Sequence, residues 1–480
     1  MSYRDFIRSQ CLINGEWIAA DSGGTLDVTD PATGEVITTV PNMGAAETAR
    51  AVAAAEAALP AWRALTAAAR AKVLRKFHDL MLANQAGLGE LLSREQGKPL
   101  AEATGEVAYS ASFIEWFAEE GRRAYGEVIP TFADNRRVVT IKQPIGVVAA
   151  ITPWNFPSAM IGRKLGPALA AGCTVVLKPA SHTPLSALAL AVLAEQAGLP
   201  KGVLNVITGS ARAIGGELTA NPAVRKISFT GSTEVGRELM RQSADTIKKL
   251  SMELGGNAPF IVFDDADVDA AVEGAVISKF RNSGQTCVCT NRFYVQDGVY
   301  DAFVTKLAAR VGKMKLGRGI EAGTDLGPLI DMAAVEKVEE HLEDALAGGA
   351  TLLTGGKRSD LGGTWFEPTV VANVTPAMKL CREETFGPLA GVVRFADEAE
   401  AITHANDSEF GLAAYFYARD LSRVWRVAEA LEAGIVGINT GLISTEVAPF
   451  GGIKQSGLGR EGSRHGLDDY MEIKYLCMGI

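Results

Sequence analysis

The chain contains 480 residues, of which 47% are hydrophobic and 21% charged. Its length exceeds what one hydrophobic core usually serves, and its composition excludes a largely disordered chain. The net charge of −9, without a run of lysine and arginine, argues against nucleic acid or an anionic membrane as a partner.

The sequence also indicates a cellular compartment. It contains no apolar run of the ~18 to 20 residues that a membrane span needs. Residues 1–10 are charged and lack the apolar segment of a secretory signal. The six cysteines are scattered, which fits a reducing compartment better than a disulfide framework. We therefore expect a cytoplasmic protein, and no metal site.

The N-terminal third begins with turns and continues with helices. Asn14 and Gly15 between apolar residues predict a β-hairpin. Residues 45–125 show a helical pattern, broken at 97–99, and we expect these helices to cover one face of a sheet. Residues 126–142 include an extended β-branched run without a local partner.

Strands and helices then alternate, which predicts a parallel, doubly wound sheet. Ligands of such a sheet bind at the carboxyl ends of its strands. The expected strands are 147–151, 174–178, 203–207, 226–229 and 249–252, and the helices between them are 157–171, with a kink at Pro167, 184–197, 211–219 and 234–242.

A second alternation of the same kind runs from residue 259 to residue 439, and we place the domain boundary near Gly255 and Gly256. The last expected strand, 469–478, belongs to neither of the two expected sheets. Together with 126–142 it makes two orphan strands, which we expect to pair with each other or with another subunit.

The most reactive side chain that we identify is Cys287, which follows the polar turn 283–286. We interpret it as a nucleophile at a helix N-terminus, where backbone N–H groups would favour a thiolate. Because free cysteines are among the most buried residue types, an inert packing role is the alternative.

Other candidates stand at strand ends. Asn155 could donate to an oxyanion or merely cap a helix, and Lys178 could bind ribose or phosphate or be a solvated loop residue. Gly231 and Ser232 open a helix that could meet a pyrophosphate, although such turns also cap ordinary helices. Glu253, near the domain boundary, could be a general base or a salt-bridged carboxylate.

Seven motifs then give a specific resemblance. From about Leu12 to its end, the chain resembles the aldehyde dehydrogenase superfamily, and it looks most similar to the succinate-semialdehyde dehydrogenases, with glutarate-semialdehyde dehydrogenases as near neighbours. The motifs, in the family order, are PWNFP, KPAS, FTGS, MELGG, GQTC, EETFGP and PFGGIKQSG, and those of the succinate-semialdehyde branch are FRNSGQTCVCTN, GLIST and KQSGLGREG.

The resemblance implies a fold of two doubly wound α/β domains and a small β oligomerisation element. Residues 1–125 and 143–254 would form the dinucleotide-binding domain, and 255–454 the catalytic domain. The oligomerisation element would comprise 126–142 and 455–480, so a homo-oligomer, a dimer or a tetramer, is expected.

It also implies a mechanism. Cys287 would attack the aldehyde to give a thiohemiacetal, with the oxyanion between the Asn155 amide and the Cys287 backbone N–H. After hydride transfer, Glu253 would activate the water that hydrolyses the thioester.

The cofactor contacts follow by similarity. Glu384 would contact the nicotinamide-side ribose, with Phe386 beside it, and Lys178 the adenosine ribose. Family members that prefer NAD tend to carry Glu where this chain has Ser181, so we expect NADP to be preferred and NAD tolerated. The remaining implied cofactor-binding residues are Trp154, Asn155, Gly231, Ser232 and Leu254.

The substrate contacts follow in the same way. Arg163, Arg281 and Ser444 match positions that hold the distal carboxylate in the succinate-semialdehyde branch. Glutaric semialdehyde, or a broad range of aldehydes, remains an alternative, and so does a non-catalytic protein of the same fold. Cys289 could form a labile disulfide with Cys287 or simply be a packing residue.

Overall fold

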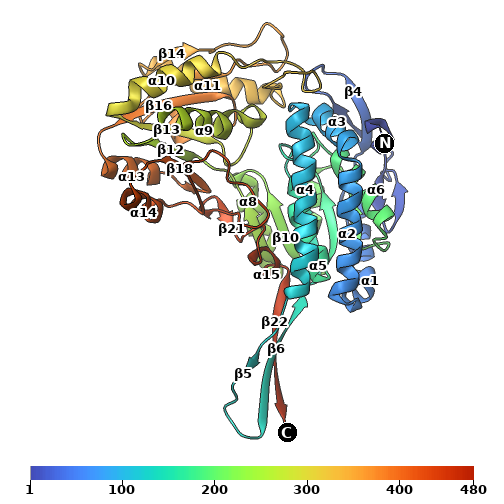
Figure 1. Ribbon diagram of the computed structural model, residues 1–480. Coiled ribbons are helices and arrows are strands. Elements are labelled where there is room, and N and C mark those ends of the chain that lie inside the picture. Colours follow the sequence, from blue (N-terminus) through green and yellow to red (C-terminus); the bar gives the residue numbers. More distant parts are fainter. Residues whose placement is uncertain (1) are drawn as a thin grey trace.

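Two large sheets and a long antiparallel arm organise the chain (Figure 1). The structure is a computed structural model, and it describes residues 2–480. Both sheets have a parallel centre with helices on both faces, so the predicted α/β class is confirmed. Within residues 2–480, no helix combines the length and the apolar character needed to cross a bilayer.

The first sheet is built from apolar strands that are buried on both faces, as parallel strands require. Its centre is parallel, a hairpin of β1 and β2 joins one edge, and β21 closes the other edge in antiparallel orientation. The order is β2 (Glu16–Ile18), β1 (Cys11–Ile13), β9 (Leu204–Val206), β8 (Thr174–Lys178), β7 (Val147–Ile151), β10 (Val224–Thr230), β11 (Lys249–Glu253) and β21 (Gly457–Leu458).

Helices cover both faces of this sheet. One face carries α2 (Ala67–Ala83), α4 (Leu100–Glu120), α5 (Ala159–Ala171) and α6 (Leu185–Ala197), with α3 (Gln85–Gln96) packed beside them. The other face carries α1 (Ala45–Ala64), α7 (Ala211–Ala220) and α8 (Thr233–Ser243). The expectation that all helices of 45–125 cover one face is therefore wrong, because α1 packs on the opposite side.

The second sheet has seven strands, and all pairs except the one at β14 are parallel. Helices α9 (Val268–Phe280) and α10 (Asp297–Val311) cover one face, and α11 (Met332–Ala347), α13 (Glu398–Asn406) and α14 (Leu421–Ala430) cover the other. The strand order is β14 (Thr351–Thr354), β15 (Thr369–Ala372), β16 (Leu389–Phe395), β13 (Thr290–Gln296), β12 (Ala258–Val262), β18 (Ala413–Tyr417) and β19 (Ile435–Ile438).

The arm confirms that the two orphan strands pair with each other. Strand β6 (Arg136–Pro144) pairs along its whole length with β22 (Met471–Gly479), and β5 (Val128–Ile129) lies on the other side of β6. Figure 1 shows this arm projecting from the body, with the C-terminus at its tip.

One expected boundary is wrong. Residues 455–470 do not belong to the arm, because β21 pairs with β11 of the first sheet and α15 (His465–Asp468) packs against α5. The remaining elements are short: β3 (Thr25–Thr29) with β4 (Val36–Pro41), β17 (Phe410–Gly411) with β20 (Ile453–Lys454), α12 (Lys379–Arg382), and the 3₁₀ turns η1 (Tyr3–Phe6), η2 (Gly121–Arg123), η3 (Ala244–Thr246) and η4 (Arg281–Gly284).

Candidate active site

Cys287 lies between η4 and β13, in a turn rather than at a helix N-terminus, so the predicted helix-terminal position is wrong. The turn before it has left-handed backbone at Asn282 (φ 52°), Ser283 (φ 56°) and Gly284 (φ 78°). At Gly284 a Cβ atom would overlap the carbonyl oxygen of Gly387. Two polar residues and a glycine suit this conformation, which aims the chain so that Cys287 faces the space between the two sheets.

Two cavities meet at Cys287. One has a volume of about 320 Å³ and the other about 260 Å³. Both are lined by Cys287, Phe156 and Met160, so the thiol stands where the two spaces adjoin. A nucleophile at such a junction can meet one ligand from each side.

The thiol of Cys287 is neutral at pH 7. Burial raises its pKa to about 12, although the nearby charges of Arg163 and Arg281 oppose this. The expected thiolate is therefore wrong for this structure, and a base has to remove the proton. Cys289 is buried, both cysteines are free, and the Cys289 thiol donates to the carbonyl of Lys279 at 3.2 Å.

Glu253 is the side chain best suited to act as the base that removes the Cys287 proton. It ends β11, is only 4% exposed, and lines the smaller cavity with Cys287. Among residues 2–480, neither of its carboxylate oxygens has a hydrogen-bond partner. Burial and the charge of Glu461 raise its pKa well above the usual range. The salt-bridged alternative fails, because no described cation pairs with it.

Asn155 lies in the loop between β7 and α5, not in the helix that carries Arg163. It does not cap α5 either: Glu106 accepts the N–H groups of Ser158 (2.9 Å) and Ala159 (3.1 Å). The Asn155 amide donates to the carbonyl oxygen of Gln285 at 3.0 Å, in the turn before Cys287. An amide has two N–H donors, so a second one remains for a ligand.

The smaller cavity gathers most of the expected cofactor residues. Glu384 accepts the N–H of Gly256 at 3.0 Å, and burial raises its pKa to about 7. Ser232 caps α8 through a bond from the N–H of Val235. The predicted residues along its walls are Trp154, Asn155, Gly231, Ser232, Glu253, Leu254, Cys287, Glu384 and Phe386.

Two expected cofactor residues stand outside both cavities. Lys178 ends β8, beside the last residue of β7, and its ammonium donates to the carbonyl of Pro179 at 3.0 Å. Burial lowers its pKa to about 8. Ser181 lies in the following loop and is exposed.

The larger cavity holds all three expected substrate residues, Arg163, Arg281 and Ser444. Arg163 is buried, with its guanidinium 4.0 Å from the ring centre of Phe450, and it donates to the Tyr109 hydroxyl at 2.6 Å. Within the described part of the chain its Nε and Nη1 atoms have no hydrogen-bond partner. Guanidinium N–H donors without an acceptor, in a cavity of this size, are suited to binding a carboxylate.

Several contributing residues were missed by the sequence analysis. Lys164 donates to Thr230 at 2.7 Å and forms an ion pair with Glu461, whose other oxygen lies 3.6 Å from Arg163. Although burial opposes it, Lys164 keeps the pKa of Glu461 lowered. Glu461 belongs to the KQSGLGREG motif, which was the available signal. Nothing in the local sequence pointed to Lys164 or Tyr109.

The whole chain is similar to proteins of one family. Residues 17–476 match the model of a protein family that is described as "Aldehyde dehydrogenase family". A glutarate-semialdehyde dehydrogenase of Pseudomonas aeruginosa is 67% identical over 472 residues, which is 98% of each protein. The NADP(+) succinate-semialdehyde dehydrogenase GabD of Escherichia coli is 65% identical over 476 residues, 99% of each protein. A crystal structure of succinate-semialdehyde dehydrogenase from Burkholderia pseudomallei is 66% identical over 99% of each chain, with a TM-score of 0.98.

Proposed function

Because this chain belongs to the aldehyde dehydrogenase family, we propose that this enzyme oxidises succinic semialdehyde to succinate with NADP(+) as the electron acceptor. The observation that carries the proposal is one cavity that combines Cys287 with two guanidinium groups, those of Arg163 and Arg281. An aldehyde with a carboxylate at its far end has the two functional groups that this cavity can receive. The family membership sets aside a non-catalytic role.

The substrate's carboxylate is held by Arg163 and Arg281, with Ser444 as a further donor. Glu461 lies 3.6 Å from Nη1 of Arg163 and Tyr109 accepts from Nη2, but Nε and Nη1 have no hydrogen-bond acceptor among the described residues. These two buried donors support the role, because leaving them unsatisfied is costly unless a ligand supplies an acceptor. The walls between the arginines and Cys287 include the apolar side chains of Phe156 and Met160, which suit the methylene groups of the substrate.

The reaction begins with proton transfer. Glu253 takes the proton of the Cys287 thiol, and the resulting thiolate forms a bond to the aldehyde carbon. The carbonyl oxygen becomes an oxyanion, which the Asn155 amide and the Cys287 backbone N–H stabilise. The product of this step is a thiohemiacetal on Cys287.

The residues of the smaller cavity would hold NADP(+), whose chemistry would be to accept the hydride that the thiohemiacetal carbon loses on becoming a thioester. Glu253 then releases its first proton to solvent and takes another from a water molecule. The water oxygen bonds to the thioester carbon, and the carbon–sulfur bond breaks. The Cys287 thiolate takes the proton that Glu253 received from the water, and the carboxylic acid product loses its own proton to solvent.

The residues of the smaller cavity fit a nicotinamide dinucleotide. A Cβ at Gly231 would overlap the ring of Phe229, so the chain there presents bare backbone at the start of α8. Glu384 can accept from a ribose hydroxyl, and Phe386 and Trp154 give apolar walls. We also propose that Cys289 is a redox partner of Cys287, with which it would form a disulfide under oxidising conditions.

The preference for NADP rests on the end of β8. Ser181 offers no carboxylate to repel a 2′-phosphate, and Lys178 supplies a nearby ammonium. We propose that NAD is tolerated.

Glutaric semialdehyde is the second candidate substrate. It is favoured by the name of the Pseudomonas aeruginosa relative. It differs from succinic semialdehyde by one methylene group, which is worth only about 1 to 3 kcal/mol in a pocket.

One set of steady-state measurements tests these proposals together. We expect kcat/KM to be highest with succinic semialdehyde and NADP(+), lower with glutaric semialdehyde, and far lower with an uncharged aldehyde of equal length. A tenfold preference for NAD would contradict the cofactor proposal. Equal rates with charged and uncharged aldehydes would contradict the substrate proposal.

The division of the chain into domains is also a proposal. We propose that residues 1–125 and 143–254 bind the dinucleotide, that 255–454 carry the catalytic turn, and that the arm joins subunits into a dimer or tetramer. All six cysteines are free, which supports a cytoplasmic location.

A further inference from the structure

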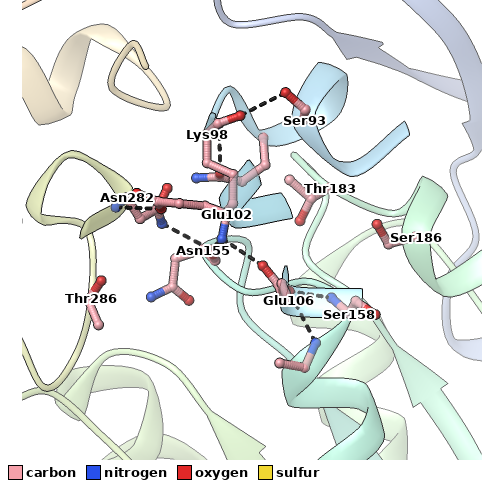
Figure 2. A network of polar contacts seen from close by, with 12 residues as sticks. Ser93, Lys98, Glu102, Glu106, Asn155, Ser158, Thr183, Ser186, Asn282 and Thr286 are labelled. Atoms are coloured by element: carbon pink, nitrogen blue, oxygen red, sulfur yellow. Dashed lines mark hydrogen bonds and ion pairs between the residues drawn. The ribbon is translucent and has the colours of Figure 1, made fainter. Parts of the chain in front are cut away.

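A fully buried lysine stands behind Asn155. Lys98 lies in the loop between α3 and α4, and its side chain has no exposed surface. Its ammonium donates to a carboxylate oxygen of Glu106 at 2.6 Å and to the main-chain oxygen of Asn155 at 2.7 Å. Figure 2 shows it between Glu106 and the loop that carries Asn155. Burying a charge is expensive, so these two bonds mark what the residue stabilises.

The main chain of Asn155 is held by a second donor as well. The side-chain amide of Asn282 donates to the same carbonyl oxygen at 3.0 Å (Figure 2). It also donates, at 3.2 Å, to the carbonyl oxygen of Gln285, which accepts the Asn155 amide. Lys98 and Asn282 therefore both hold the Asn155 carbonyl, and Asn282 links it to the Gln285 carbonyl that accepts the Asn155 side chain in the turn before Cys287.

The lysine is itself held in place. Its N–H donates to the side chain of Gln96 at 3.0 Å, and its carbonyl accepts from the Ser93 hydroxyl at 2.7 Å. Its partner Glu106 bonds the first N–H groups of α5, so the ion pair also anchors the helix that follows Asn155. The loop that carries Lys98 is thus bonded directly to the Asn155 carbonyl and, through Glu106, to the start of α5.

Lys98 lines neither cavity, whereas Glu106 lines the larger one. The ammonium thus has two separable effects. It holds the Asn155 carbonyl, and it neutralises a carboxylate that would otherwise repel the substrate's own carboxylate.

We infer that Lys98 is a positioning residue, whose ammonium holds the Asn155 backbone so that the Asn155 amide meets the oxyanion formed at Cys287. The inference rests on the proposed role of Asn155. Catalytic groups tolerate little displacement, since an error of about 1 Å can cost ~100-fold in rate.

A double-mutant cycle tests the coupling. The variants are Lys98→Met, Asn155→Ala and their combination. The readouts are kcat with succinic semialdehyde and the cofactor-free hydrolysis of para-nitrophenyl acetate, which needs Cys287, Glu253 and the oxyanion site but no dinucleotide. Asn155→Ala should lower both rates about 100- to 1000-fold. Lys98→Met should lower both about 10- to 100-fold.

The combined variant should be no slower than Asn155→Ala alone, because Lys98 acts through Asn155. Losses that multiply would overturn the inference, and so would a Lys98→Met enzyme with unchanged kcat.

A second pair of variants separates positioning from stability. Lys98→Met leaves a buried carboxylate without its cation, so its Tm should fall and its KM for succinic semialdehyde should rise. Lys98→Met combined with Glu106→Gln should recover Tm and KM but not kcat. Recovery of kcat as well would mean that Lys98 only neutralises Glu106 and does not position Asn155. The matched control is Lys226→Met, which removes another fully buried lysine, bonded to Ser251, and should lower Tm while kcat is retained.

The rates of Asn155→Ala and Lys98→Met distinguish an error in the role of Asn155 from an error in the role of Lys98. If Asn155→Ala keeps its rates, the proposed oxyanion role is wrong and the inference falls with it. If Asn155→Ala loses them and Lys98→Met does not, the inference alone is wrong.

Discussion

Glu253 sets the pH dependence that we expect at the residue scale. It must be ionised to accept a proton, and its pKa is raised well above the ordinary range by burial and by Glu461. The rate should therefore rise with pH, with a midpoint above the ~4.3 of a solvated glutamate. A pH profile of kcat/KM measures this, and Glu253→Gln should remove the limb and lower kcat by about 100- to 10,000-fold.

A second acid could produce a similar limb, because the pKa of Glu384 is about 7. Glu384→Gln is therefore the control, and it should keep the limb. A midpoint near 4 in the unaltered enzyme, or a limb that survives Glu253→Gln, would show that Glu253 is not the base.

Arg281 gives the sharpest test of substrate recognition. Arg281→Ala removes one of the two guanidinium groups from the larger cavity, so it should cost about 2 to 4 kcal/mol in kcat/KM for succinic semialdehyde, mostly through KM. The rate with an uncharged aldehyde should barely change. The control is Arg310→Ala, a surface arginine paired with Glu273. Equal losses with both aldehydes would mean that Arg281 supports the fold rather than the carboxylate.

At the residue scale, the sequence predicted which residues form the site better than it predicted their surroundings. Cys287, Glu253 and Asn155 were recognisable from motifs, and they do lie on the walls of one cavity. Their protonation was not predictable, because the pKa of Cys287 depends on burial by elements distant in the sequence. Lys98 was noted only as part of a helix break, since its partner Asn155 lies far along the chain.

At the scale of elements, the turn before Cys287 is the most constrained. Gly284→Ala would place a methyl group against the carbonyl oxygen of Gly387 in a left-handed conformation. We expect a clear fall in Tm and a loss of kcat, because the turn must shift and carries Cys287 with it. Gly362→Ala is the matched control: its φ is 76°, but the space around it is open, so it should cost only about 1 kcal/mol and no activity.

The alternation of strands and helices was predictable because apolar runs and their helical partners are local patterns. Which strands form the edges of each sheet was not predictable. Strand β21 has only two residues, and its pairing with β11 joins two segments that lie far apart in the sequence. Likewise α1 shows the same alanine-rich pattern as its neighbours but packs on the opposite face.

At the scale of the whole molecule, the arm exposes apolar side chains. Ile473 is 70% exposed and Tyr475 58%, and because they are two residues apart on β22 they share one face. Replacing both with Asp should shift sedimentation toward a smaller species, since charges oppose burial between subunits. Leu361→Asp, an exposed leucine in a loop, should leave the mass unchanged. A double variant that sediments like the parent enzyme would exclude the arm as the contact.

The pairing of β6 with β22 has a consequence for biosynthesis. Strand β6 is translated long before its partner β22, which lies far later in the sequence. Until then the nascent chain carries an unpaired edge that no local segment can satisfy. Completion of the arm, and with it any assembly of subunits through it, must therefore wait until β22 has been translated. A chain terminated before β22 would carry the main strands of both sheets and yet be unable to join finished subunits through the arm.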